Sequence, residues 1–287
     1  MSSTAETIHA KPVALDGSKV ALWRRQISAI LRLELKKNFF GKRSLLVYLM
    51  AAMPIGLLVL VEAINPLGGQ DTPQLPTVYS IFYNSLILRT IVFFGCAWIF
   101  MNLFRGEIVD RSLHYYFLSS VRREVLVTGK YLSGLLTSVI LFTTVTVVCM
   151  LLVFFSHNQS SGMRFFFDGS GISQLLWYVA ITILACVGYG AFFLVVGLFV
   201  RNPIIPALLL YGWEWINFLL PPLLKKISVI HYLNSLVPVP ISEGPFAVVA
   251  EPTPAWISIP GLLIVTALVL IAAGTRIRRM EIRYGSD

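Results

Sequence analysis

Long apolar runs alternate with short polar segments along this chain of 287 residues. An apolar run of about 20 residues is long enough to cross the hydrocarbon core of a bilayer as a helix. Charged residues make up only 13% of the chain, against about 25% in ordinary soluble domains, and the mean hydropathy is +0.77. The pattern therefore predicts an all-α integral membrane protein with six transmembrane helices. They are expected at about 45–64, 84–104, 131–155, 175–200, 203–224 and 255–274.

The distribution of Lys and Arg predicts the topology. With the N-terminus inside the cell, the cytoplasmic segments hold 19 of the 23 Lys and Arg, the external loops hold three, and Arg89 lies in the second span. This asymmetry agrees with the positive-inside rule. We therefore expect a multi-pass protein of the plasma (inner) membrane with both termini in the cytoplasm. Cytoplasmic tails are expected at 1–19, which is polar and flexible, and at 281–287, on either side of a six-span domain over 20–280.

The basic character of the chain suits a membrane surface better than a nucleic acid. The net charge of +9 can attract anionic lipid, whereas no polar domain is present to bind a nucleic acid. The first apolar run begins near Leu45, which is too far along the chain for a cleavable signal peptide. Membrane lipid is therefore an expected partner, and nucleic acid is not.

Residues 20–40 have the pattern of an amphipathic helix at the inner membrane surface. Apolar residues recur every four positions, and basic residues lie on the other side of the helix. Arg24 and Glu34 interrupt the apolar side. The alternative is a basic flank that merely orients the first span, but the Trp and Leu residues favour the surface helix. The apolar positions are Trp23, Ile27, Leu31, Leu35 and Phe39.

The segment between the fifth and sixth spans is unusual for an external loop. Between Pro221 and Pro254 it is rich in proline but also in Leu, Ile and Val. Apolar backbone that does not span the membrane is tolerated where it packs against protein or lines a cavity. The pattern therefore predicts an external re-entrant element before the sixth span.

Three charged residues, Glu62, Arg89 and Glu214, lie inside apolar runs, where charge is unfavourable and often functional. Glu62 and Arg89 are both expected near the outer interface, where they would form an ion pair or would each reach the interface separately. Glu214 is expected near the middle of the fifth span. It would line a translocation path or bond a neighbouring helix, and the structural role is favoured slightly.

Motifs for catalysis and for nucleotide binding are absent from the sequence. The Gly-Lys pairs at 41–42 and 129–130 lack the spacing of a phosphate-binding loop, and no Gly-x-Ser-x-Gly or His-Glu-x-x-His motif occurs. The three Cys lie in apolar runs and the four His lie in separate segments, so no metal site is expected. The chain is therefore not expected to be an enzyme or to hold a cofactor.

A charged and aromatic segment over 105–130 follows the second span. It resembles the coupling region of type 2 ABC transporter permeases, in which an acid closes span two and a Leu-rich segment and a short turn precede a helix that ends in Gly-Lys. Glu107 fits the acid, and Ser120 and Arg122 depart from the Pro and Ser common in the turn. Leu113, Phe117 and Leu118 fit the middle, Val121 and Arg123 fit the turn, and Gly129-Lys130 fits the end. The six spans, the surface helix and the outer apolar element also match this family, over about residues 20–280.

The resemblance implies the transmembrane subunit of an ATP-driven exporter, in which ATP and Mg are bound by a separate cytoplasmic ATPase. It also implies a second permease copy, in a homodimer or a heterodimer, and a cytoplasmic coupling helix between spans two and three. The coupling residues would be Glu107, Leu113, Tyr116, Phe117, Arg122, Arg123 and Lys130. The apolar spans suit a lipid-like, amphipathic or small-molecule cargo. The alternatives are a secondary transporter or channel that uses Arg89 and Glu214, and a membrane assembly protein without transport.

Overall fold

The computed structural model describes residues 19–41, 44–64, 75–109, 123–155, 164–200, 202–225, 228–239 and 253–278. All regular structure in these ranges is helical, as the apolar pattern predicts. The elements are α1 (Lys19–Phe40), α2 (Ser44–Ile64), α3 (Leu75–Phe82), the π-helix η2 (Tyr83–Val92), α4 (Phe93–Val109), α6 (Arg123–Phe155), α8 (Gly171–Phe199), α9 (Ile204–Ile216), the 3₁₀ turn η3 (Asn217–Leu219), α10 (Pro222–Lys225), α11 (Val229–Asn234) and α12 (Ala255–Arg278).

Five of the helical segments are long and apolar enough to cross a membrane. This confirms that the chain is a multi-pass, all-helical membrane protein over its described part. The five segments are Ser44–Ile64, Leu75–Gly106, Val125–Phe155, Gly171–Phe199 and Ala255–Thr275.

The predicted fifth span, over 203–224, is not one helix. α9 has 13 residues, or about 20 Å at ~1.5 Å per residue, whereas a hydrocarbon core is about 30 Å thick. The chain then passes through η3 to Pro221, which lies outside the helices, and Pro222, which begins α10. A proline disfavours the helical conformation of the residue before it and lacks an N–H donor. The sequence analysis predicted one span here because the residues on both sides of this break are apolar.

The helix of the second span begins earlier than predicted, at Leu75 instead of 84, because α3, η2 and α4 are continuous. Several side chains of the first turns are buried, among them Leu75, Tyr79 and Ser80. Tyr79, for example, donates a hydrogen bond from Oη to the carbonyl of Thr146 over 2.9 Å. Tertiary packing thus extends the helix beyond its purely apolar part.

The helix of the third span is also longer than predicted, since α6 is continuous from Arg123 onward. Gly129 and Lys130 lie within α6, so they do not end a separate coupling helix. Residues 110–122 of the expected coupling segment lie outside the described residues, as do residues 1–18 and 279–287. Of the predicted re-entrant stretch over 221–254, residues 226–227 and 240–252 lie outside them, and the described part contains the short helices α10 and α11.

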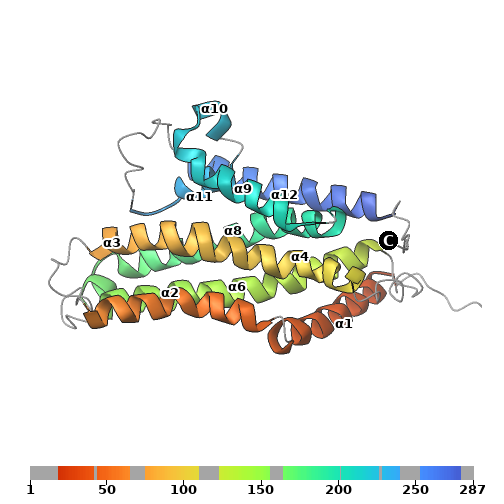
Figure 1. Cartoon of the computed structure of the whole chain (residues 1–287), viewed down its shortest axis with the longest axis horizontal. Helices are drawn as coiled ribbons and strands as arrows, with labels where there is room; N and C mark the ends of the chain where they lie inside the picture. The colour runs from red at the N-terminus through yellow and green to blue at the C-terminus, as the bar shows by residue number, and fades with distance from the viewer. Residues whose placement is uncertain are drawn as a thin grey trace, which may run out of the picture.

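The long helices run side by side as a bundle, with α1 at one end (Figure 1). α2 ends and α3 begins at the far end, while α12 ends near α1. α4 and α8 approach each other closely: a Cβ on Gly197 would lie 2.6 Å from the Cα of Met101. Small residues allow membrane helices to approach this closely.

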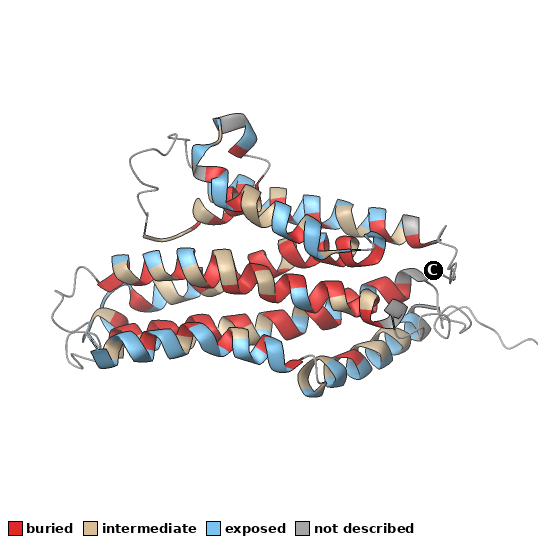
Figure 2. Cartoon of the chain, viewed as in Figure 1, coloured by how far each residue is buried: buried red, intermediate tan, exposed pale blue. Residues whose placement is uncertain are grey.

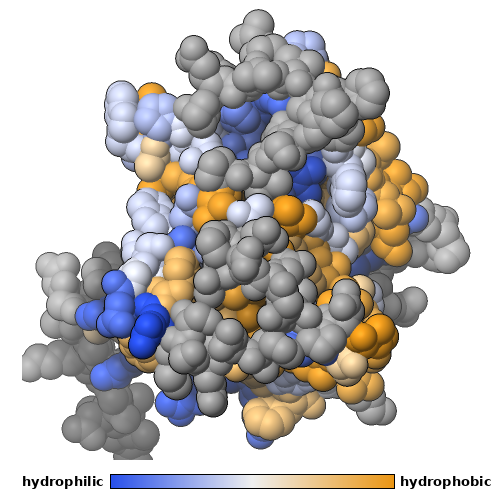
Figure 3. Space-filling model, turned by 90° about the vertical axis from the view of Figure 1, so that its left-hand side faces the viewer, coloured by the Kyte–Doolittle hydropathy of each residue, from blue (hydrophilic) through white to orange (hydrophobic). Residues whose placement is uncertain are grey.

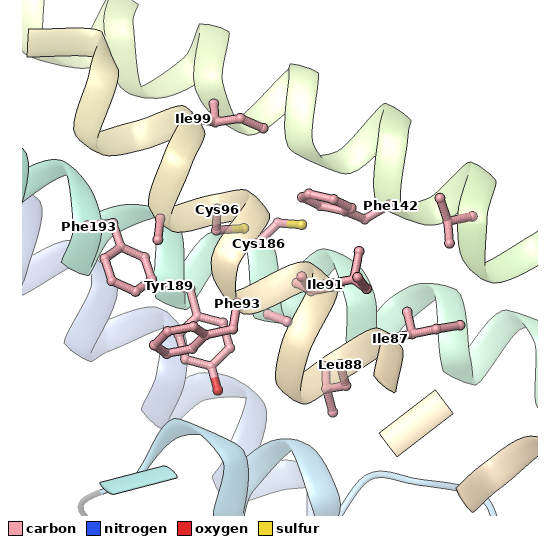
Figure 4. Packing of buried hydrophobic residues seen from close by; sticks show 14 of the residues in the cluster. Ile87, Leu88, Ile91, Phe93, Cys96, Ile99, Phe142, Cys186, Tyr189 and Phe193 are labelled. Carbon is pink, nitrogen blue, oxygen red and sulfur yellow. The ribbon is translucent and has the colours of Figure 1, made fainter. Parts of the chain in front are cut away.

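Buried side chains concentrate where these helices meet, and α2 and α12 carry many exposed apolar side chains (Figure 2). In the core, Phe93 packs edge-to-face on Tyr189 and Phe193, with ring centroids 5.2 and 5.1 Å apart (Figure 4). The end-on view of Figure 3 shows apolar surface along one side of the molecule. This exterior is suited to contact with lipid.

Candidate functional site

Most of the predicted coupling residues lie outside the part of the chain that the structure describes. Leu113, Tyr116, Phe117 and Arg122 fall in the gap between α4 and α6. Two more, Glu107 and Arg123, are placed by their backbone only, at the end of α4 and the start of α6. The remaining one is Lys130, which is fully buried in α6.

Lys130 joins three helices through its ammonium group. Nζ lies 2.6 Å from Oε1 of Glu34 in α1 and donates to the carbonyl of Leu103 in α4 over 2.9 Å. It also lies 5.3 Å from the ring centroid of Phe104, within the range of a cation–π contact. We call this cluster of Glu34, Leu103, Phe104 and Lys130 the Lys130 junction. Its buried ammonium has a carboxylate, a carbonyl and an aromatic face as partners.

The face that α1 packs against α6 passes through Glu34. Ile30, Glu34 and Asn38 recur at four-residue spacing, so they lie on one side of the helix. A Cβ on Gly129 would lie 3.0 Å from Ile30, and Asn38 donates to Oγ1 of Thr137 over 3.5 Å. The sequence analysis took Glu34 as an interruption of the apolar side, and the structure shows that its carboxylate is 1% exposed and paired.

The Lys130 junction lies beside the segment that the resemblance identified as the coupling region. α4 enters that segment at its N-terminal side and α6 leaves it at its C-terminal side. The ammonium of Lys130 connects both helices to α1.

Glu214 lies near the end of α9 and is 3% exposed. Its carboxylate accepts three hydrogen bonds: from Ser228 Oγ at 2.5 Å, from the N–H of Val229 at 3.2 Å and from the N–H of Ile230 at 3.1 Å. The first N–H groups of a helix have no partner within it, and the N-terminus carries partial positive charge. Glu214 thus caps α11 from another helix, which agrees with the structural role.

Arg89 lies deeper in the membrane than predicted. It is the fifteenth of the 32 residues in Leu75–Gly106, so it lies near the middle of this span, while Glu62 is near the end of α2. These two described residues form no ion pair with each other, because their depths differ. Arg89 donates from Nε to Oδ1 of Asn84 over 3.0 Å, and Asn84 donates to Oδ1 of Asn234 over 2.7 Å.

Two tyrosines lie near this chain of polar groups. Tyr211 packs on Phe93 and Phe94, and its Oη is 3.5 Å from Oγ1 of Thr90. Tyr189 packs on the same Phe93, which follows Arg89 by four residues on the same continuous helix. We call Asn84, Arg89, Tyr189, Glu214 and Asn234 the mid-span polar cluster. It connects η2, α8, α9 and α11.

The sequence analysis missed Glu34, Asn84 and Tyr189 as members of these two sites. The signal for Glu34 was an acid on an apolar helix face. Asn84 and Tyr189 lie in apolar runs that contain other Asn and Tyr residues, so nothing local distinguished them. Among the described residues, no group of three or more His, Cys, Asp and Glu could hold a metal ion.

Comparisons of the chain with protein-family models, with curated proteins and with solved structures gave no match. The two sites therefore have to be interpreted from their own geometry.

Proposed function

We propose that this chain is the transmembrane subunit of an ATP-driven transporter of the type 2 ABC class. The proposal rests on one observation: the Lys130 junction connects α1, α4 and α6 beside the segment that resembles a coupling region. A membrane subunit moved by a cytoplasmic ATPase needs a rigid connection between the docking segment and its helices. A buried charge with several partners provides such rigidity, because separating the groups would leave a charge without compensation.

The partner in this proposal is a cytoplasmic ATPase that binds ATP and Mg. Tyr116, Phe117, Arg122 and the neighbouring residues would dock in a groove of that protein. Tyr and Phe side chains on a solvated loop are unfavourable unless a partner covers them. A second permease copy, identical or homologous, would complete the transporter in the plasma membrane, with both termini of each chain in the cytoplasm.

The cargo in this proposal is a lipid-like, amphipathic or small molecule that is exported. Support comes from the largely apolar and aromatic spans, which suit a ligand with apolar parts. The orientation is supported by the sequence, in which the segments expected in the cytoplasm hold 19 of the 23 Lys and Arg.

A test starts with the purified ATPase partner and the detergent-solubilised chain. The double variant Tyr116→Ala/Phe117→Ala should abolish stimulated ATP hydrolysis, while the amount of inserted protein stays normal. Trp256→Ala is a matched control, since Trp256 is an exposed aromatic residue at the start of α12. Full stimulation in the double variant would contradict docking through this segment.

A secondary transporter is the second candidate, and the depth of Arg89 favours it. A charge near the middle of a span can couple to ion movement. The position of Glu214 argues against it, since three hydrogen bonds already engage the carboxylate that would exchange protons. Transport that stops when a proton gradient collapses, and continues when ATP is depleted, would favour this alternative.

A further inference from the structure

Arg89 carries a positive charge near the middle of the membrane with little compensation. A guanidinium has five N–H donors, and Asn84 accepts one of them. Within the described ranges no carboxylate forms an ion pair with Arg89. The oxygens of the Glu214 carboxylate accept hydrogen bonds from Ser228 and from the start of α11. An arginine at this depth is unfavourable without a nearby anion.

Tyr189 supplies a second, independent observation. Its side chain is 1% exposed, and its hydroxyl has no hydrogen-bond partner among the described residues. Most buried hydroxyl groups in proteins have a partner, so an unsatisfied one calls for an explanation. Figure 4 shows the Tyr189 ring beside Phe93, with its hydroxyl directed away from Cys96 and Cys186 and toward the blue ribbons of the C-terminal elements. Arg89 lies four residues before Phe93 on the same continuous helix, and the ring centroid of Phe93 is 5.2 Å from that of Tyr189.

Both groups donate hydrogen bonds, so they require an acceptor. A guanidinium binds carboxylate and phosphate groups strongly because it can donate two parallel hydrogen bonds to them. The surrounding side chains, Phe93, Phe94 and Tyr211, are aromatic and suit an apolar tail. Arg89 also lies in a π-helix, and π-helical turns are frequent at functional sites.

We infer that Arg89 and Tyr189 bind the anionic group, a carboxylate or a phosphate, of an amphipathic molecule. This inference rests on the proposed function only in identifying the bound molecule as cargo. The binding site itself is a property of the chain alone. Asn84 positions the guanidinium, and Asn234 positions Asn84.

Binding of dodecyl phosphate and of dodecanoate to the full chain in a neutral maltoside detergent tests this inference. Dodecyltrimethylammonium is the cationic probe of equal chain length. The wild-type chain should bind the two anions and not the cation. Arg89→Gln should weaken anion binding at least tenfold, Arg89→Lys should restore part of it, and Tyr189→Phe should weaken it severalfold. Arg164→Gln, which alters an exposed arginine, is the matched control and should bind as the wild type does.

Equal anion binding by the wild type and Arg89→Gln would overturn the inference, and so would an equal loss in Arg164→Gln. The anion can come from cargo or from a membrane lipid, and nanodiscs with and without phosphatidylglycerol separate the two sources. If phosphatidylglycerol displaces dodecyl phosphate, the site binds a membrane lipid. If dodecyl phosphate binds equally well in both kinds of nanodisc, the site binds single-chain molecules. Either result supports the inference only if the binding is lost in Arg89→Gln. The assay contains no ATPase, so its failure leaves the proposed function intact. Arg89-dependent binding without ATPase coupling would contradict the proposed function alone.

Discussion

Glu34 and Glu214 are both buried acids among apolar helices, and the protein stabilises them in different ways. Glu34 faces a full opposite charge, the ammonium of Lys130, at 2.6 Å. Glu214 faces one hydroxyl and two backbone N–H groups at the start of α11. The first arrangement depends on one partner residue, whereas the second spreads over several groups. The difference shows that the stability lost when one partner is substituted depends on whether one group or several groups stabilise the buried carboxylate.

The largest effect is expected at the Lys130 junction. Lys130→Met should lower the free energy of unfolding by about 3–5 kcal/mol, because it leaves the Glu34 carboxylate buried without its counter-charge. The measurement is thermal or denaturant unfolding in detergent, followed by helical circular dichroism. The double variant Lys130→Met/Glu34→Met should recover most of the loss, since neither charge remains. Lys36→Met, at an exposed position of α1, is the control. Additive losses in the double variant would mean that the pair contributes nothing as a unit.

A smaller effect is expected at Glu214. Glu214→Gln places an NH₂ group where a carboxylate oxygen accepted, so in either orientation of the amide one backbone N–H of α11 faces a donor. The free energy of unfolding should fall by about 1–3 kcal/mol. The transport rate per folded molecule should stay the same, which reconstituted vesicles would measure. Native melting together with lost transport would instead place Glu214 on a translocation path.

Ser228→Ala sharpens the comparison further, because it removes one of the three donors to Glu214. The N–H groups of Val229 and Ile230 remain, so the loss of stability should be about 1 kcal/mol. Ser85→Ala, at an exposed position of η2, is the matched control. If Ser228→Ala lowered the stability as much as Lys130→Met, the Ser228 hydroxyl alone would stabilise the Glu214 carboxylate.

The smallest effect is expected for Asn38→Ala, at the edge of the Lys130 junction. The bond from Asn38 to Thr137 is 3.5 Å long, which is at the limit for a hydrogen bond. Unfolding measurements should show a loss below about 0.5 kcal/mol, less than an average hydrogen bond contributes. A larger loss would indicate that α1 is held along its whole contact face and not mainly at Lys130.

Part of the candidate site was predictable from the sequence. Arg89 and Glu214 stood out because a charge in an apolar run is rare. Their partners were not predictable, since Asn84, Ser228 and Asn234 are ordinary polar residues until the fold brings them together. An ion pair of Glu62 with Arg89 was one of two alternatives, and it is not found among the described residues because the second span begins earlier along the chain than predicted. The docking role of residues 113–122 stays a prediction.

The sequence by itself determined that this chain is helical and lies in a membrane, because backbone groups in hydrocarbon must be satisfied within the segment and about 20 apolar residues are needed to span it. The first, fourth and sixth predicted spans correspond closely to long helices for this reason, and the second and third correspond to long helices that begin earlier than predicted. The fold was needed to learn how far along its helix Arg89 lies and that Glu34 meets Lys130. The second contact depends on which helix faces meet across 96 positions of chain. Hydropathy records the composition of each segment and carries no information about the neighbour that a side chain will contact.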